Sequence, residues 1–222
     1  TKNYFTYGFD KKANYQICNT KYSIGRTKFD IKVKNNVSKI FYIRNISLNL
    51  IGKYNVLNAS AAVSLCLNLG LKTKIIKKAL KNFSGVERRL TKVFKKNNVE
   101  FYDDYAHHPT EIKSVLEAVK KVTPKRKIIT IFQPHRYSRL RTLKSEFTKC
   151  FKDTDQLILC PVYAAGEGID KKFNPINFAK LISKFSKAQV IIVENELDIT
   201  KYLRKNLIND EVVIGMGAGS IS

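Results

Sequence analysis

The sequence lacks the marks of a membrane-spanning or secreted protein. Its apolar runs are all shorter than the roughly 18 residues that a bilayer span needs. The first ten residues, TKNYFTYGFD, contain no apolar core of a signal peptide. They also lack an initiator methionine, so we expect a piece of a longer chain. Disorder is excluded as the main state, because 44% of the residues are hydrophobic and recur in regular patterns.

Cysteine is scarce, and its spacing excludes two kinds of site. No C-x-x-C pair occurs, and no cysteine stands beside a histidine at the spacing of zinc ligands. Two cysteines lie in apolar runs and are predicted to be buried and reduced, which favours a cytoplasmic location. The buried pair is Cys66 and Cys160, and the other two are Cys18 and Cys150.

Acidic residues are few: 18 stand against 41 lysines and arginines, a formal charge of +23. Such a balance can indicate a nucleic-acid partner or an anionic surface. Here the excess is mostly lysine, spread along the chain, with no recognition motif beside it. We therefore interpret it as charge on solvated faces and expect neither a nucleic-acid nor a membrane partner, keeping a basic RNA-binding α/β module as the rival class.

The first part of the sequence predicts strands followed by two helices. Alternating apolar residues rich in tyrosine, phenylalanine and isoleucine favour antiparallel strands up to about residue 51. A helix over 54–69, stopped by Gly70, and a second over 74–82 follow. The predicted strands are 4–9, 14–19, 27–33, 38–44 and 46–50, with a polar turn after the second and a turn at Lys34-Asn35-Asn36.

The second part alternates strands with helices, which predicts a Rossmann-like, doubly wound, mostly parallel sheet. Pro109 is expected to begin one helix, and another is expected to carry Leu140, Leu143, Phe147 and Phe151. The boundary between the two parts is placed near residues 83–86. The predicted strands are 99–102, 128–132, 157–160, 190–193 and 212–214, and two further helices begin near residue 175 and residue 197.

Polar residues collect where the predicted strands end, which is where α/β sheets bind ligands. All three histidines fall in two of these loops. At most one of the adjacent His107 and His108 is expected to be functional, and the other to cap the helix at Pro109. Arg136 and Arg139 stand at a helix start, where cations are unfavourable, which favours an anionic ligand. The loops are DDYAHHP (103–109), QPHRYSR (133–139), VYAAGEG (162–168) and GMGAGS (215–220), the last a weak dinucleotide-binding signal, typical of a dehydrogenase.

These loops, taken in order with three upstream segments, resemble the Mur ligases, the ATP-dependent amide-forming enzymes of peptidoglycan synthesis. The upstream segments are TYGFD (6–10), GKYNVLNASAA (52–62) and GVERRL (85–90). The resemblance implies that residues 1–84 are the end of the family's central ATP-binding domain. Residues 85–222 are then its carboxyl-terminal Rossmann-like domain.

The FQPHRYSR segment (132–139) is similar to the alanine-adding branch of that family. The resemblance implies that ATP phosphorylates UDP-N-acetylmuramate and that L-alanine attacks the acyl phosphate. The branch that recycles murein tripeptide is the alternative. The sequence departs from the family in lacking a G-x-x-G-K-[ST] loop, and the family's Mg²⁺ ligands are expected upstream. The chain alone is therefore expected to be inactive. Two smaller departures are Ala106, where the family commonly has glycine, and Ser220, where it usually has asparagine.

The resemblance also implies roles for single residues. Arg136 is expected to hold the alanine carboxylate, and His135 to assist the amine or orient the acyl phosphate. For Asp104 the expectation is a bond to the ATP ribose, and the alternative is a structural cap of the strand–helix turn. The residues expected to bind ATP are Asn55, Asn58, Arg89 and Asp104. The residues expected to bind the other substrates are Tyr105, His107, His135 and Arg136. Of these, His135 and Arg136 are the catalytic candidates, and no metal ligand is assigned.

Overall fold

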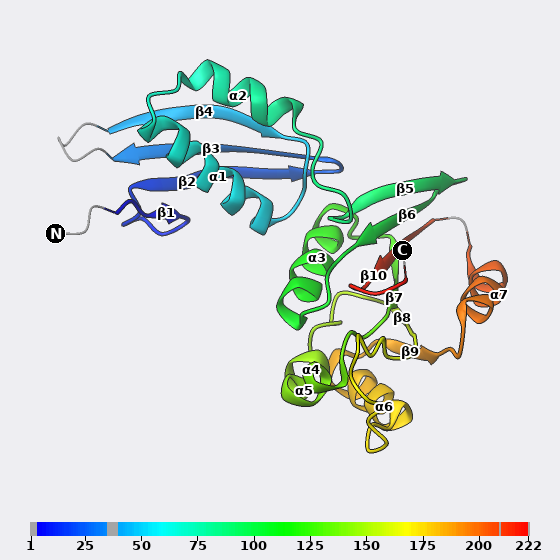
Figure 1. Ribbon diagram of the computed structural model, residues 1–222. Coiled ribbons are helices and arrows are strands. Elements are labelled where there is room, and N and C mark those ends of the chain that lie inside the picture. The colour runs from blue at the N-terminus through cyan, green and yellow to red at the C-terminus, as the bar shows by residue number, and fades with distance from the viewer. Residues whose placement is uncertain (1–3, 35–39, 209, 222) are drawn as a thin grey trace. The chain divides into compact units, whose positions relative to one another are not determined.

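The computed structural model describes residues 4–34, 40–208 and 210–221 (Figure 1). The chain forms two compact units, residues 1–85 and residues 86–222. Each has its own sheet and its own buried core. In the described ranges, no helix combines the length and the apolar character that crossing a membrane would require.

The first unit is a four-stranded sheet in the order β1-β2-β3-β4, with both helices packed on one face. Strands β2, β3 and β4 are antiparallel, as expected, whereas the short β1 pairs parallel with β2. Alternate residues of the strands, such as Phe29 and Ile31, are fully buried beneath Val56 and Val63 of α1. The elements are β1 (Tyr7–Gly8), β2 (Tyr15–Ser23), β3 (Arg26–Lys34), β4 (Ile40–Leu48), α1 (Lys53–Asn68) and α2 (Thr73–Asn82).

Asparagines with positive φ make two of these strands longer than predicted. The polar turn expected between residues 19 and 27 is present but short, at Ile24-Gly25, because Asn19 takes φ 52° within a bulge between Cys18 and Lys21 and β2 continues to Ser23. Likewise Asn45, with φ 56°, lets the segments 38–44 and 46–50 join as β4. Of the turn predicted at Lys34-Asn35-Asn36, the last two residues lie outside the described ranges.

The first helix begins and ends as the sequence predicts. Gly70 takes φ 81° just beyond its end, a conformation that favours glycine and stops the helix. The buried positions on this helix include Ala59 and Val63. Cys66, predicted to be buried, is only half-buried at the edge of the core, whereas Cys160 in the second unit is buried.

The second unit is a six-stranded sheet in the order β5-β6-β10-β7-β8-β9, which confirms the predicted doubly wound fold. Five strands are parallel, and only the edge strand β5 is antiparallel. Strand β5 was not predicted, because it is exposed along its whole length and has no apolar signal of a buried strand. The strands are β5 (Thr91–Lys96), β6 (Val99–Asp104), β7 (Lys127–Phe132), β8 (Gln156–Leu159), β9 (Gln189–Ile192) and β10 (Glu211–Met216).

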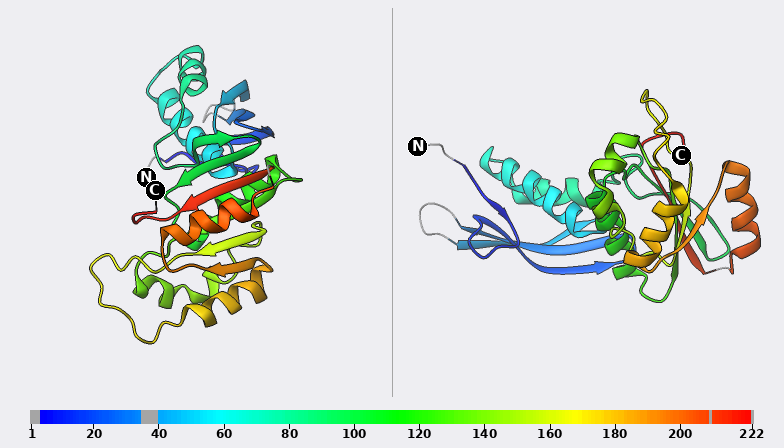
Figure 2. Two further views of the ribbon diagram at one scale, coloured as in Figure 1. Left: turned by 90° about the vertical axis from the view of Figure 1, so that its right-hand side faces the viewer. Right: turned by 90° about the horizontal axis from the view of Figure 1, so that it is seen from below.

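Helices cover both faces of this sheet (Figures 1 and 2). Helix α7 packs through Ile199 on the face that carries Ile129, and α3 to α6 lie on the other face. The helix predicted to run through Phe151 is broken at Leu143 into α4 and α5, while Phe147 and Phe151 still pack against Phe132. The helices are α3 (Pro109–Val122), α4 (Tyr137–Thr142), α5 (Lys144–Phe147), α6 (Pro175–Ser186) and α7 (Glu196–Asn206).

Candidate active site

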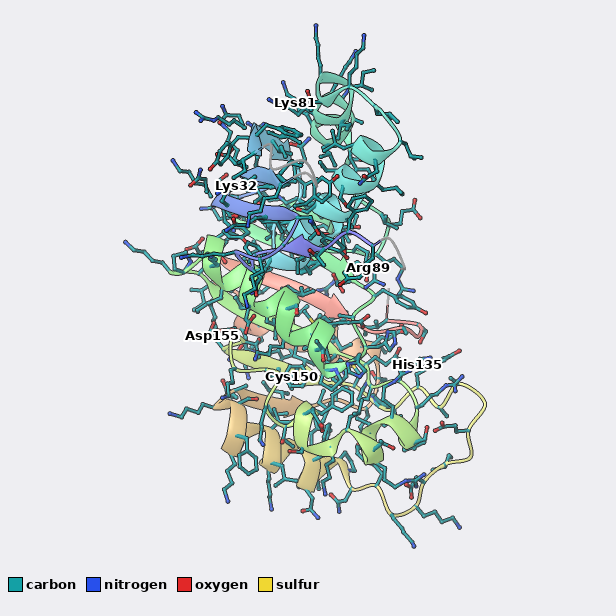
Figure 3. The ribbon with its side chains drawn as sticks, turned by 90° about the vertical axis from the view of Figure 1, so that its left-hand side faces the viewer. Lys32, Lys81, Arg89, His135, Cys150 and Asp155 are labelled. Atoms are coloured by element: carbon teal, nitrogen blue, oxygen red, sulfur yellow. The ribbon has the colours of Figure 1, made fainter. Side chains whose placement is uncertain are left out.

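The loops that carry the unusual residues meet at one edge of the second unit. Strand β10 lies between β6 and β7, and β8 follows β7, so the carboxyl ends of these four parallel strands are neighbours. Figure 3 shows Arg89 and His135 at this end of the sheet and Asp155 at the opposite end. We call this edge, formed by residues 88–90, 103–111, 133–139, 162–168 and 217–220, the rim.

One of the two adjacent histidines caps the helix that begins at Pro109, as expected, and the other does not. His108 is the N-cap of α3: its Nδ1 accepts a hydrogen bond from the Thr110 amide at 3.3 Å. The Glu111 carboxylate reaches back to the amides of His107 and His108 at 3.2 and 3.3 Å and completes a capping box. The His107 ring turns instead toward His135, with 5.8 Å between the ring centroids. His107 is therefore the histidine of this pair whose ring faces another rim loop.

Asp104 is buried at the end of β6, with 1% of its surface exposed. Its two carboxylate oxygens accept hydrogen bonds from the amides of Leu90 and Ala106, each at 2.7 Å. Burial raises the pKa of this carboxyl to about 6, although the two amide bonds and the nearby Arg89 work in the opposite direction. The geometry favours the alternative that Asp104 fixes the backbone of two rim segments.

The neighbouring arginines 88 and 89 differ in how firmly the fold holds them. The Arg88 guanidinium donates to the Gly217 carbonyl at 2.8 Å, lies 3.3 Å from an Asp103 oxygen and covers the Tyr105 ring at 4.9 Å. Arg89 is about half exposed, and its ion pair with Glu111 spans 3.8 Å. Arg88 thus ties three rim segments together, while Arg89 has more freedom to meet a ligand.

His135 is held in place by Tyr163 and Arg139. Its backbone forms a bridge with Tyr163, and the two rings stack with 5.6 Å between centroids. The Arg139 guanidinium lies 3.2 Å from Nδ1 of the His135 ring and donates to the His135 carbonyl at 3.2 Å. Burial, followed by Arg139, His107 and Arg136, holds the pKa of His135 below its ordinary value, with Glu167 acting against them. This lowered pKa favours the neutral form of the ring.

Arg136 stands exposed at the start of α4, with a backbone φ of 71° that is rare for residues other than glycine. No carboxylate lies within 4 Å of the Arg136 or the Arg139 guanidinium in the described part of the chain. The anionic ligand expected at this helix start stays a prediction, and a carboxylate of the chain itself also lies there. Glu167 accepts hydrogen bonds from the Ser138 amide, at 3.0 Å, and from the Ser138 hydroxyl. These bonds hold the pKa of Glu167 below its ordinary value.

Two of the three glycines in the GMGAGS segment, Gly217 and Gly219, serve close packing between loops. A Cβ atom on Gly219 would lie 2.7 Å from Cγ of Tyr163 and would also strike the Gln133 side chain. A Cβ atom on Gly217 would meet the Gln133 carbonyl oxygen at 3.0 Å. These residues are therefore required where the loop after β10 presses against the loops after β7 and β8.

The two asparagines predicted to meet the nucleotide belong to the first unit. Asn55 stands in the first turn of α1 and donates from its side-chain amide to the Ile51 carbonyl at 2.8 Å. Asn58, one turn on, is exposed. Across the described residues, no group of three or more histidine, cysteine, aspartate or glutamate side chains is placed to hold a metal ion. The exposed guanidiniums of Arg89 and Arg136 are groups that suit an anionic ligand.

Known proteins with the same fold and sequence pattern identify the family. A family model described as "Mur ligase, glutamate ligase domain" matches residues 88–219. The UDP-N-acetylmuramate–L-alanine ligase of Pelagibacter ubique is 45% identical over 221 residues, which are 100% of this chain and 48% of that protein.

Solved structures agree with this assignment. The UDP-N-acetylmuramate–alanine ligase of Thermotoga maritima superposes with a TM-score of 0.76 at 29% identity, covering 98% of this chain and 45% of that one. A murein peptide ligase of Psychrobacter arcticus shares the fold, with a TM-score of 0.62 at 20% identity over 96% of this chain and 43% of that one. The chain spans about half the length of the curated relatives it matches. The chain belongs to the Mur ligase family.

Proposed function

We propose that this chain forms part of an ATP-dependent ligase that joins L-alanine to UDP-N-acetylmuramate in peptidoglycan synthesis in the cytoplasm. One observation carries the proposal: the whole chain aligns, at 45% identity, with a ligase of that name. The rim supports it, because exposed guanidinium groups stand at the carboxyl ends of parallel strands, where α/β enzymes bind ligands.

Arg136 is the residue that we assign to the alanine carboxylate. Its guanidinium is exposed and has no carboxylate partner within 4 Å among the described residues. A planar guanidinium binds a carboxylate through two parallel hydrogen bonds. The strained backbone of Arg136 is held by the bond from its amide to the Tyr163 carbonyl, at 2.9 Å, so the side chain starts from a fixed position.

The rim has further groups for the other reactants. His135, neutral and clamped, is proposed to orient the acyl phosphate, with Tyr105 and His107 on the facing side. Arg89 is assigned to ATP, and Asp104 keeps the ribose role as a hypothesis tested below. The assignment of Asn55 and Asn58, which lie in the first unit, to ATP stays a prediction from the sequence. Bound ATP with Mg²⁺ supplies the phosphoryl group that activates the carboxylate. This chain's residues would contribute cations and fixed donors around that anion.

The proposal is tested by exchanging the matching segment in a relative. We define the exchange ligase as the Pelagibacter ubique ligase in which this chain replaces the 221 residues it aligns with. We expect phosphate release that requires both UDP-N-acetylmuramate and L-alanine. A folded exchange ligase that releases phosphate with murein tripeptide but not with L-alanine would assign the chain to the recycling branch instead.

The isolated chain provides the matching control. Its 222 residues contain no G-x-x-G-K-[ST] loop for the ATP phosphates. We therefore expect no phosphate release from the isolated chain with the same substrates. Release that depends on both UDP-N-acetylmuramate and L-alanine would show that the phosphates are bound in another way.

A further inference from the structure

Each of the three histidines has a different kind of partner at its Nδ1 atom, and the partner decides which ring nitrogen carries the proton. A carbonyl oxygen can only accept a hydrogen bond, whereas a backbone amide or a guanidinium can only donate one. A neutral imidazole has one donor nitrogen and one acceptor nitrogen, so fixing the role of Nδ1 also fixes the role of Nε2.

His107 has acceptors at Nδ1. The Tyr105 carbonyl oxygen lies 2.9 Å from this nitrogen, and a Glu111 carboxylate oxygen lies 3.7 Å away. Nδ1 must therefore carry a proton, and the neutral ring has its lone pair on Nε2. The edge-to-face contact with the Tyr105 ring, at 5.3 Å, keeps the imidazole in this orientation.

His135 has the opposite arrangement. Its Nδ1 faces a guanidinium nitrogen of Arg139 at 3.2 Å, so Nδ1 must accept and Nε2 must carry the proton. The same guanidinium nitrogen also donates to the His135 carbonyl, which fixes Arg139 relative to the ring. Stacking on Tyr163 prevents the ring from turning freely.

We infer that the two histidines that meet at the rim are held in opposite neutral tautomers, so that His107 presents a proton acceptor and His135 a proton donor. Their ring centroids are 5.8 Å apart, close enough for both rings to face one reacting group. Arg139 is a positioning residue in this arrangement, because it acts through His135.

Resting on the proposed function, the two tautomers divide the work of amide formation. The alanine nitrogen forms a bond to the acyl carbon, and the bond from that carbon to the phosphate oxygen breaks, with its electron pair leaving on phosphate. The proton lost by the amine passes to Nε2 of His107. The Nε2–H of His135 donates a hydrogen bond to the anionic oxygen of the acyl phosphate.

Kinetics of the exchange ligase test this division of work. His107→Gln removes the proton acceptor, so kcat should fall on the order of a hundredfold or more while the KM for L-alanine changes little. An unchanged kcat would overturn the acceptor role of His107.

The tautomers themselves are measured on the 222-residue chain, without substrates, by long-range ¹H–¹⁵N correlation NMR of ¹⁵N-labelled histidine at mildly alkaline pH. Single His→Gln variants assign the three rings. We expect the Nδ1–H form for His107 and the Nε2–H form for His135 and for the helix cap His108. The Nε2–H form at His107, or the Nδ1–H form at His135, would overturn the inference.

A matched pair of variants tests the role of Arg139. Arg139→Met should release His135 into a mixture of both tautomers, whereas Arg141→Met, which removes an exposed ion pair with Asp170, should leave all three rings unchanged. A folded Arg139→Met chain in which His135 stays in the Nε2–H form would refute the positioning role. Because no substrate is involved, the predicted tautomers in a chain whose exchange ligase is inactive would count against the proposed function alone.

Discussion

The two ends of the sheet in the second unit use charge in different ways. At the amino end, the half-buried Arg126 guanidinium lies 2.8 Å from the Glu100 carboxylate and 3.3 Å from Asp210, and Lys92 also binds Glu100. At the carboxyl end, the carboxylates of Asp104 and Glu167 accept from backbone amides instead. Arg88 and Arg89 do form ion pairs there, but the Arg136 guanidinium has no carboxylate within 4 Å among the described residues. The amino end therefore neutralises its own charges, whereas the carboxyl end keeps a guanidinium available for a ligand.

The electrostatics of two carboxylates illustrate the difference. Burial works to raise the pKa of Glu100, but hydrogen bonds from Lys92 and Arg126 outweigh it, and the pKa lies below its ordinary value. Burial of Asp104 is not offset in this way, and its pKa rises to about 6. Cations therefore hold Glu100 in its charged form, whereas Asp104 is held by backbone amides in a buried position that favours its protonated form.

The largest effect is expected at the amino end. Arg126→Met leaves Glu100, whose side chain is 10% exposed, without its nearest guanidinium. Removing one partner of a buried ion pair costs about 3–5 kcal/mol, and we expect a loss of unfolding free energy near the lower value in urea denaturation. The control Arg141→Met breaks an ion pair whose arginine is 72% exposed and should cost less than about 1 kcal/mol. Equal losses in both variants would erase the distinction between the two kinds of pair.

The next effect concerns the pH dependence of Asp104. Its folded pKa of about 6 exceeds the ordinary 3.8, so folding favours the protonated carboxyl. That contribution is complete below about pH 4 and is lost as the pH rises through 6. Subtracting the unfolding free energy of Asp104→Asn from that of the natural chain isolates this group, and the difference should fall by about 3 kcal/mol over that interval. A difference that stays constant with pH would show that Asp104 does not titrate with folding.

The same variant separates the two roles considered for Asp104. In the exchange ligase, a residue that only fixes the backbone leaves the affinity for a non-hydrolysable ATP analogue unchanged once the protein is folded. A ribose contact would instead weaken that affinity in calorimetric titration. The buried position and the two amide bonds lead us to expect unchanged affinity.

A smaller effect distinguishes the adjacent histidines. His108→Ala removes the N-cap of α3, which typically costs about 1 kcal/mol, and should lower the melting temperature without lowering kcat in the exchange ligase. His107→Ala should do the reverse. If both variants lose the same stability and keep full activity, it is wrong that His108 serves the helix and His107 serves the reaction.

Much of this arrangement follows from the sequence, because parallel strands place their carboxyl ends together. The loops with His107, His135 and Arg136 were expected at one edge, and the order β6-β10-β7-β8 places them there. Contacts between loops were not predictable. Glu167 accepts a hydrogen bond from the first turn of α4, 29 residues away in the sequence, and Arg88 donates one to Gly217, 129 residues away. No sequence pattern predicts either hydrogen bond.

The tautomers of the histidines also required the structure. Composition places His107 and His135 in polar loops, but only the neighbouring atoms show that one Nδ1 donates and the other accepts. Strand β5 was not predicted because all of its residues are exposed, so the sequence has no alternation of buried and exposed residues that would indicate a strand.

The most direct test of the central claim, that the rim cations serve a ligand, is the KM for L-alanine in the exchange ligase. Arg136 has no carboxylate partner within 4 Å in the described ranges, so Arg136→Ala should leave stability nearly unchanged. A bidentate charge-assisted contact is worth about 1.5–3 kcal/mol, so the KM for L-alanine should rise about tenfold or more, well beyond any change for ATP. A folded Arg136→Ala enzyme with an unaltered KM for L-alanine would contradict the account.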